Sequence, residues 1–285
     1  MTTPTTENSP SPHQQLSLRA DYPTRIVCLT EETTETLYML GEEQRIVGIS
    51  GFTVRPPRAR KEKPKVSAFT SAKIDKILAL RPDLVLGFSD LQADIGAELA
   101  RAGVPVHLFN QRSIAEILSM ILMLGGMVGA HEKAATLVTT LQAQLEHIRE
   151  QANRLALRPR IYFEEWNDPC ISAIRWVSEL ITLAGGEDCF AELATHQDAK
   201  SRIIADPQTV VERNPDIIIG SWCGRRFRPE NVRQRPGWDQ ISAVQHDQLF
   251  EIKSPDILQP GPAALTDGVA QLHRFISVWA EKQLQ

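Results

Sequence analysis

Two short segments in the second half of the chain hold most of the residues that could do chemistry. Residues 162–170 read YFEEWNDPC, with two carboxylates, a tryptophan and a thiol, and residues 221–226 read SWCGRR. Thiolates and carboxylates bind zinc and iron, and clustered carboxylates can serve as acid and base. One interpretation is therefore a metal-binding enzyme or metallochaperone that uses Glu164, Glu165, Cys170 and Cys223.

The spacing of these side chains does not single out a metal site. The four cysteines include no CxxC pair, and the seven histidines form neither HxH nor HExxH. Cys170 and Cys223 could equally form a labile disulfide or be inert buried thiols. His196, in an expected loop, could be an axial ligand of a bound cobalt or iron, or a plain surface histidine.

Aromatic residues at expected strand ends favour binding over catalysis. Trp166, Trp176 and Trp222 lie at strand ends or helix starts, where sites in open α/β sheets form. A third loop, 254–262, follows an expected strand at 249–252 and adds Asp256 and Gln259. We expect these loops to converge on one cleft. The chain has no GxSxG, no P-loop and no GxGxxG after a strand, so we predict no enzymatic activity.

Alternating strands and helices must position these loops. Expected strands at 25–29, 46–49, 84–88 and 104–109 alternate with helices at 32–40, 71–80 and 93–102, which is typical of parallel βαβ units. Residues 74–87 (IDKILALRPDLVLG) and 207–220 (PQTVVERNPDIIIG) share the order helix, Pro-Asp, strand, glycine. The repeat predicts two similar lobes; the alternative is a chance similarity of two ordinary αβ turns.

A long helix is expected between the lobes. Residues 113–124 predict a helix interrupted at Gly125 and Gly126, and apolar residues recur at three and four over 130–155, a span of about 39 Å. The alternative is a long surface helix of a single domain. We predict a disordered tail (1–22), an N-terminal α/β lobe (23–112), a helical linker with the backbone helix (113–156) and a C-terminal α/β lobe (157–285). The predicted fold is therefore α/β, with two Rossmann-like lobes with parallel sheets joined by one long backbone helix.

Charge and hydropathy exclude some partners. The 285 residues carry 31 basic and 35 acidic side chains, a formal charge of -4, which gives no reason to expect nucleic acid or an anionic membrane. No window is apolar enough to span a membrane, and residues 1–22 lack the pattern of a secretory signal. We therefore expect a monomer located in the cytoplasm.

Basic residues nevertheless gather in two places. Residues 55–65 read RPPRARKEKPK, and the second half holds Arg202, Arg225, Arg226, Arg228, Arg233 and Arg235. If both groups border the cleft, they favour an anionic ligand. The alternative for 55–65 is a solvated, mobile loop.

The order of several motifs resembles one family. They are RIVCLTEETTETLYMLG (25–41), VGISGFTVRPP (47–57), VSAFTSAKIDKILALRPDLVLG (66–87), WVSELITLAGG (176–186), ADPQTVVERNPDIIIG (205–220) and PGPAALTDGV (260–269). Together with the long central helix, they resemble the helical-backbone substrate-binding proteins of metal-chelate ABC importers, above all the vitamin B12 (cobalamin) and siderophore binders. The resemblance covers residues 25 to about 279 and implies a class III periplasmic-binding-protein fold.

The resemblance implies a clamp with little lobe motion that holds a cobalamin-like corrinoid or another metal chelate, without a cofactor or metal of its own. Phe52 and Phe69 match positions where similar cobalamin binders carry aromatic residues, although a phenylalanine more often fills a core. The expected ligand-binding residues are Phe52, Phe69, Glu165, Trp166, Trp176, Trp222, Cys223, Asp256 and Gln259.

The resemblance also implies docking to an ABC permease through one acidic residue on each lobe. The first position matches Asp75. The second falls on Gln208, with Asp206 two residues earlier. This departure and the missing signal pattern favour an intracellular derivative of the importer proteins; the alternative is a periplasmic location, as in the family.

Overall fold

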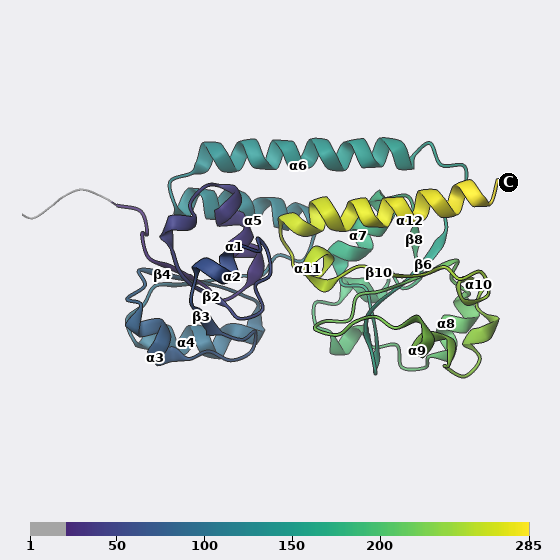
Figure 1. Ribbon diagram of the computed structural model, residues 1–285, viewed down its shortest axis with the longest axis horizontal. Helices are drawn as coiled ribbons and strands as arrows, with labels where there is room; N and C mark the ends of the chain where they lie inside the picture. The colour runs from purple at the N-terminus through teal and green to yellow at the C-terminus, as the bar shows by residue number, and fades with distance from the viewer. Residues whose placement is uncertain (1–20, 285) are drawn as a thin grey trace, which may run out of the picture.

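The computed structural model describes residues 21–284 and shows two α/β lobes below a layer of helices (Figure 1). Apart from Asp21 and Tyr22, the predicted tail lies outside the described residues. The first lobe is a parallel sheet in the order β3-β2-β1-β4-β5. Its strands are β1 (Ile26–Cys28), β2 (Ile46–Ser50), β3 (Lys65–Ser67), β4 (Leu84–Phe88) and β5 (Val106–Phe109), and its helices are α1 (Glu31–Met39), α2 (Ala59–Glu62), α3 (Ile74–Ala79) and α4 (Ala93–Arg101).

The second lobe has a sheet in the order β10-β9-β6-β7, with β8 also paired to β6. Its strands are β6 (Arg160–Asn167), β7 (Cys170–Ser172), β8 (Glu187–Asp188), β9 (Ile217–Gly220) and β10 (Leu249–Glu251). Its helices are α7 (Arg175–Leu183), α8 (Gln208–Arg213), α9 (Pro229–Arg233), α10 (Ser242–Gln245) and α11 (Ser254–Ile257). The predicted parallel arrangement is confirmed for β10, β9, β6 and β8, and one antiparallel strand is added, because β6 continues to Asn167 and turns back into β7.

The repeated helix, Pro-Asp and strand segments adopt the same structure in both lobes. Asp83 accepts hydrogen bonds from the backbone N–H groups of Thr24 and Arg25, just before β1. Asp216 accepts one from the N–H of Arg160 at the start of β6. In each lobe the residue before the proline has a positive φ, 47° at Arg81 and 42° at Asn214. In both lobes, the aspartate of the repeat therefore anchors the turn between helix and strand to the neighbouring strand by accepting backbone hydrogen bonds.

Three helices cover both lobes on one side: α5 (Ile114–Met127), α6 (His131–Ala152) and α12 (Val269–Lys282) (Figure 1). The predicted backbone helix is α6, although it begins and ends a little inside 130–155. The predicted interruption at Gly125 is wrong, since α5 continues to Met127. A Cβ atom at Gly125 would lie 2.3 Å from that of Ala134, so this glycine allows α5 and α6 to approach closely.

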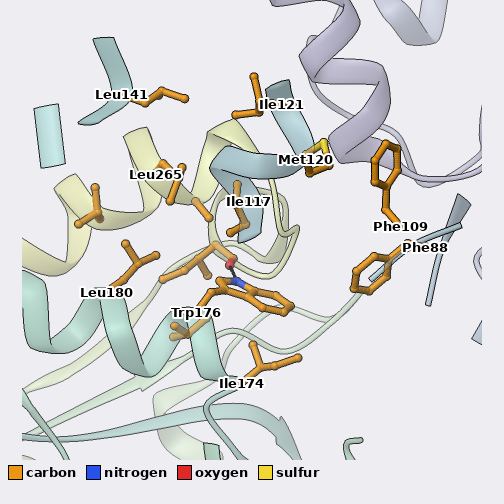
Figure 2. Close-up of a cluster of buried hydrophobic side chains, with 14 of the residues drawn as sticks. Phe88, Phe109, Ile117, Met120, Ile121, Leu141, Ile174, Trp176, Leu180 and Leu265 are labelled. Atoms are coloured by element: carbon orange, nitrogen blue, oxygen red, sulfur yellow. Dashed lines mark hydrogen bonds between the residues drawn. The ribbon is translucent and has the colours of Figure 1, made fainter. Parts of the chain in front are cut away.

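The helical layer joins the two lobes through a continuous buried core (Figure 2). Phe88 at the end of β4 and Phe109 at the end of β5 lie on one side of this core, and helix α7 of the second lobe lies on the other. Ile117 and Met120 of α5 fill the space between them. Trp176 of α7 belongs to the same cluster and is 2% exposed. Since interiors of this kind are closely packed, the structure favours small movements between the lobes.

The domain boundaries stay a prediction. The first and second lobes correspond to the sheets within 23–112 and 157–285, but α12 lies beside α6 in the helical layer. Within residues 21–284, no helix combines the length and the apolar composition that a membrane span requires.

Candidate functional site

The carboxyl ends of the strands in both sheets meet at the seam between the lobes. The guanidinium of Arg55, in the loop after β2, donates to Asp256 of α11 at 3.0 Å. The side chain of Gln111, just after β5, donates to the carbonyl of Pro260 at 2.9 Å. Because these contacts join strand-end loops of opposite lobes, the loops beside them lie at the seam between the lobes, which is where the cleft is expected.

The second lobe contributes an ion pair and a stacked tryptophan to this cleft. Glu165 pairs with Arg202, with N–O distances of 2.5 and 3.2 Å, and Arg202 is itself buried. The guanidinium of Arg225 lies 4.9 Å from the ring centre of Trp166. The indole N–H of Trp166 donates to the carbonyl of Asp168 at 2.8 Å. These contacts hold the half-buried indole in place while leaving part of its surface accessible.

The first lobe contributes apolar surface and a cation. Phe52, after β2, is 62% exposed, and Leu91, after β4, is 58% exposed. Phe69 is partly buried and packs on the core. Arg112, after β5, lies over the ring of Phe88 at 4.7 Å. Burial lowers the pKa of Arg112; the charge of Asp90 opposes this decrease, and the charge of Arg202 adds to it.

The buried side chain of Gln92 holds two strand-end loops of the first lobe in place. Gln92 is fully buried; its amide nitrogen donates to the carbonyl of Phe69 at 2.8 Å, and its oxygen accepts from the N–H of Phe88 at 2.9 Å. Gln92 therefore ties together the loops after β3 and β4. Sequence reasoning missed Gln92, Leu91 and Arg112, although all three closely follow expected strands, which is the signal that could have identified them.

A basic cavity of about 490 Å³ lies at the carboxyl ends of β9 and β10. Arg225, Arg226 and Lys253 line it, together with Trp222, Ser254 and Glu251. The Glu251 carboxylate already accepts the N–H of Phe227 at 2.9 Å. Three cations against one acid make this cavity suited to an anionic group.

A second cavity of about 520 Å³ lies at the β6–β7 turn and the start of α8. Its lining includes Asn167, Asp168 and Asp206, with Gln208 beside them. Asp206 is exposed, and its carboxylate accepts the N–H of Gln208 at 2.9 Å. Asp75 is exposed in the first turn of α3, the corresponding helix of the first lobe. Of the two residues predicted to dock a permease, Asp75 therefore lies within its helix, whereas Asp206 lies two residues before the first residue of α8.

Two of the three predicted tryptophans lie in the protein interior. Trp176 donates its indole N–H to the carbonyl of Ile257 at 2.8 Å, and Trp222, 4% exposed, donates to Glu164 at 2.9 Å. The edge of Trp222 still reaches the basic cavity. Trp176 presents no comparable surface, because it is packed between α5 and the seam segments.

Asp256 and Gln259 lie at the seam. Asp256 pairs with Arg55, and Gln259 is half-buried two residues before Gly261, whose N–H donates to its carbonyl. The structure thus places Asp256 and Gln259 in the closure between the lobes.

The side chains suggested for metal chemistry are separated or already occupied. Glu164 is fully buried and accepts from Tyr162, Trp222 and Arg235, so no lone pair faces a ligand. All four cysteines are free thiols, with Cys170 buried and Cys223 exposed. Although Cys223 is exposed as a residue, the protein atoms around its sulfur raise the pKa of the thiol by desolvation, and the charge of Glu165 raises it further, which disfavours the thiolate that a metal requires.

Within the described residues, no group of three or more His, Cys, Asp and Glu side chains is arranged to hold a metal ion. His196 is an exposed residue after a short helical turn, Leu193–Thr195.

The two basic groups have different environments. In the 55–65 segment, Arg55 pairs with three carboxylates, Arg58 pairs with Glu43, and Arg60 donates to the carbonyls of Gly51 and Thr53. The alternative of a solvated loop is therefore wrong for Arg55 and Arg60, which are partly buried, whereas the side chain of Arg58 is 55% exposed. In the second lobe, Arg202 pairs with the partly buried Glu165 and Arg235 pairs with the buried Glu164, while Arg225 and Arg226 face the basic cavity.

Comparison with known proteins agrees with this architecture. The model of the family described as "Periplasmic binding protein" matches residues 26–255. An uncharacterised ABC transporter substrate-binding lipoprotein, YvrC of Bacillus subtilis, is 27% identical over 273 residues, which cover 93% of this chain and 83% of the relative. A vitamin B12-binding protein of Vibrio cholerae is 25% identical over 266 residues, 91% of each chain.

The fold also matches solved structures. A periplasmic heme-binding protein of Pseudomonas aeruginosa superimposes with a TM-score of 0.76 at 21% identity, covering 90% of this chain and 93% of that one.

These comparisons overturn the expectation of a cytoplasmic protein. The matching family is one of periplasmic binding proteins, and the relative from Bacillus subtilis is a lipoprotein of an ABC transporter. The findings point to a periplasmic location rather than a cytoplasmic one. Because the family model spans most of the chain and the fold agrees, the protein belongs to the periplasmic binding protein family.

Proposed function

We propose that this protein is a non-catalytic substrate-binding protein that holds a metal chelate of the tetrapyrrole class, with a cobalamin-like corrinoid as the first candidate, in the interlobe cleft. The observation that carries the proposal is the pair of aromatic faces at opposing strand ends, Phe52 on the first lobe and Trp166 on the second. A flat macrocycle gains affinity by stacking on such faces. The relatives named for vitamin B12 and heme binding support this ligand class.

We further propose that the charged groups of the cleft bind the periphery of the ligand. Arg225, Arg226 and Lys253 line a cavity beside Trp222, and corrinoids and haems carry phosphate or carboxylate side arms. Phe69 and Leu91 would border the macrocycle on the first lobe, while Glu165 and Cys223 would border it on the second. Glu165 remains paired with Arg202, so the ligand would meet a neutral ion pair rather than a lone carboxylate.

We also propose that the loaded protein delivers its ligand to an ABC permease through Asp75 and Asp206. Both carboxylates are exposed, on corresponding segments of the two lobes. The acceptors of the neighbouring cavity, Asn167 and Asp168, would add partners for an incoming arginine of the permease.

The test is retention of a chromophore. The purified protein is incubated separately with hydroxocobalamin, haem and a ferric siderophore, free ligand is removed by gel filtration, and the visible spectrum of the protein fraction is recorded. We expect stoichiometric retention of a tetrapyrrole. Retention of the siderophore alone would contradict the proposed ligand class, and retention of none would contradict the chelate-binding function.

A further inference from the structure

The interlobe seam holds more carboxylates than its neighbouring cation can neutralise. Arg55 pairs with Glu35, Asp256 and Asp267 at 2.8, 3.0 and 2.6 Å. Its backbone N–H also donates to Glu31 at 2.9 Å. A further carboxylate, Glu32, has no ion pair among the interactions of the described residues. Three glutamates of α1 are thus buried at a seam where Arg55 is already shared between the lobes.

Glu32 is the most deeply buried of these carboxylates, with 1% of its surface exposed. One oxygen accepts the Thr30 hydroxyl at 2.6 Å, and the other is buried without a hydrogen-bond partner. An ionised carboxylate is poorly stabilised in such a place, because no cation offsets its loss of hydration. The environment therefore favours the neutral acid.

A segment of the second lobe covers Glu32. A Cβ atom at Gly261 would lie 2.5 Å from the Cβ of Glu32, so only a glycine lets the backbone approach this closely. The N–H of Ala263 donates to Glu35 at 3.1 Å, and the carbonyl of Pro260 accepts from Gln111 at 2.9 Å. Separation of residues 260–263 from α1 would return water to Glu32, so closure of the seam and protonation of this side chain are linked.

We propose that Glu32 and residues 260–263 form a proton-dependent latch between the two lobes: the segment closes over the neutral carboxyl group, and its contact with α1 weakens when Glu32 ionises. The latch is a property of the ligand-free protein and goes beyond the proposed function. It makes the strength of lobe closure a function of pH.

The direction of the pH dependence follows from the groups around Glu32. Desolvation raises the pKa of Glu32 from 4.5 to about 7, and Glu35 adds to the increase. Desolvation also raises the pKa of Glu31 to about 8 and that of Glu35, although Arg55 opposes the latter. Groups with a raised pKa stabilise the closed seam fully below about pH 4.5, and this stabilisation is lost as the pH rises through about 7.

The other charged neighbours do not reverse this direction. Asp256 and Asp267 face Arg55 from the second lobe. On β1, desolvation raises the pKa of Cys28 to about 12, so it stays neutral, and Lys63 lies close enough to influence that thiol.

The test is amide hydrogen exchange of the ligand-free protein at about pH 4 and about pH 8.5, read by mass spectrometry over residues 254–268. Wild type and Glu32→Gln are compared at the same pH, which cancels the intrinsic pH dependence of exchange. The amide mimics the neutral acid. We expect nearly equal exchange at the lower pH and exchange on the order of a hundredfold faster in wild type at the higher pH.

Two controls make the result specific. Helix α4 reports on regions away from the seam, and Glu98→Gln changes an exposed glutamate on that helix. Glu98→Gln should leave the exchange of residues 254–268 unchanged, and the exchange of α4 should be the same in wild type and Glu32→Gln. Equal exchange in wild type and Glu32→Gln at the higher pH would overturn the latch, and so would faster exchange in the variant at both pH values, which would indicate a purely structural role. If Glu32→Gln does not fold, wild type alone tests the latch. After correction for intrinsic exchange rates, residues 254–268 of wild type must still lose protection above about pH 7.

Discussion

At the scale of single residues, the wall of the second lobe depends on buried charges that are fully paired. Glu164, within β6, accepts two hydrogen bonds from Arg235 at 2.5 and 2.9 Å and one from the indole of Trp222 at 2.9 Å. It thereby connects β6 to the loop after β9 that lines the basic cavity. Glu164 is thus a supporting residue of the site, held in place by a cation from a distant part of the chain.

This pairing gives a prediction for Arg235→Met. Loss of the guanidinium leaves the Glu164 carboxylate buried without its counter-ion, which costs about 3–5 kcal/mol in similar cases. We expect a decrease of that size in the free energy of unfolding measured by urea titration. The matched control is Arg233→Met, which removes an exposed ion pair with Asp247 and should cost at most about 1 kcal/mol. Equal effects of the two substitutions would contradict the role assigned to Arg235.

Local chemistry could be predicted from the sequence at some residues and not at others. Pro82 and Asp83, with their counterparts Pro215 and Asp216, were predictable because a proline ends a helix within its own neighbourhood. The burial of Trp222 was not, because its partner Glu164 lies 58 residues away. A short-range pattern cannot show which distant side chain a tryptophan will meet.

At the scale of elements, the helical layer depends on the approach of α5 to α6. Gly125 faces Ala134 across this contact, whereas Gly126, the next residue, has open space at its Cβ position. The sequence showed two adjacent glycines and predicted a break. Close packing against α6 explains Gly125, and only the position of α6 distinguishes Gly125 from Gly126.

The two glycines provide a matched pair of substitutions. We expect Gly126→Ala to stabilise the protein by about 0.5–1 kcal/mol, because alanine favours the helix at a site with free space. Gly125→Ala should instead destabilise it by about 1–3 kcal/mol, because the new methyl group overlaps Ala134. Thermal unfolding of both variants checks this prediction. A rise of the melting temperature in both would contradict close contact between α5 and α6.

At the scale of the whole molecule, the two lobes, the helical layer and the strand-end loops were predictable, since each follows from a periodic pattern or a repeat. The arrangement of α12 beside α6 was not, because it depends on contacts between distant parts of the chain. The β6–β7 hairpin is local, with Asn167 paired to Cys170, and was missed because polar residues and a proline interrupt the apolar pattern there. The location of the protein was also predicted wrongly, from a segment outside the described residues.

Docking to a permease is a prediction at this scale. We expect Asp75→Asn with Asp206→Asn to reduce uptake of labelled ligand by cells that carry the cognate permease, while the purified variant binds the ligand as wild type does. Removal of the two charges would weaken the contact with permease arginines. The control is Glu150→Gln, an exposed change on α6. Unchanged uptake in the double variant would contradict docking through these carboxylates.

The central claim is that the chelate lies in the interlobe cleft against Phe52. Its most direct test is a visible-absorbance titration of wild type, Phe52→Ala and Met123→Ala with the chelate that the protein retains. Phe52 is 62% exposed at the seam, and Met123 is 50% exposed on α5, so both changes remove a large exposed apolar side chain. We expect Phe52→Ala to weaken binding by about 1–3 kcal/mol, roughly tenfold to a hundredfold in Kd, and Met123→Ala to leave it unchanged. Equal affinity of all three proteins would contradict the placement of the ligand.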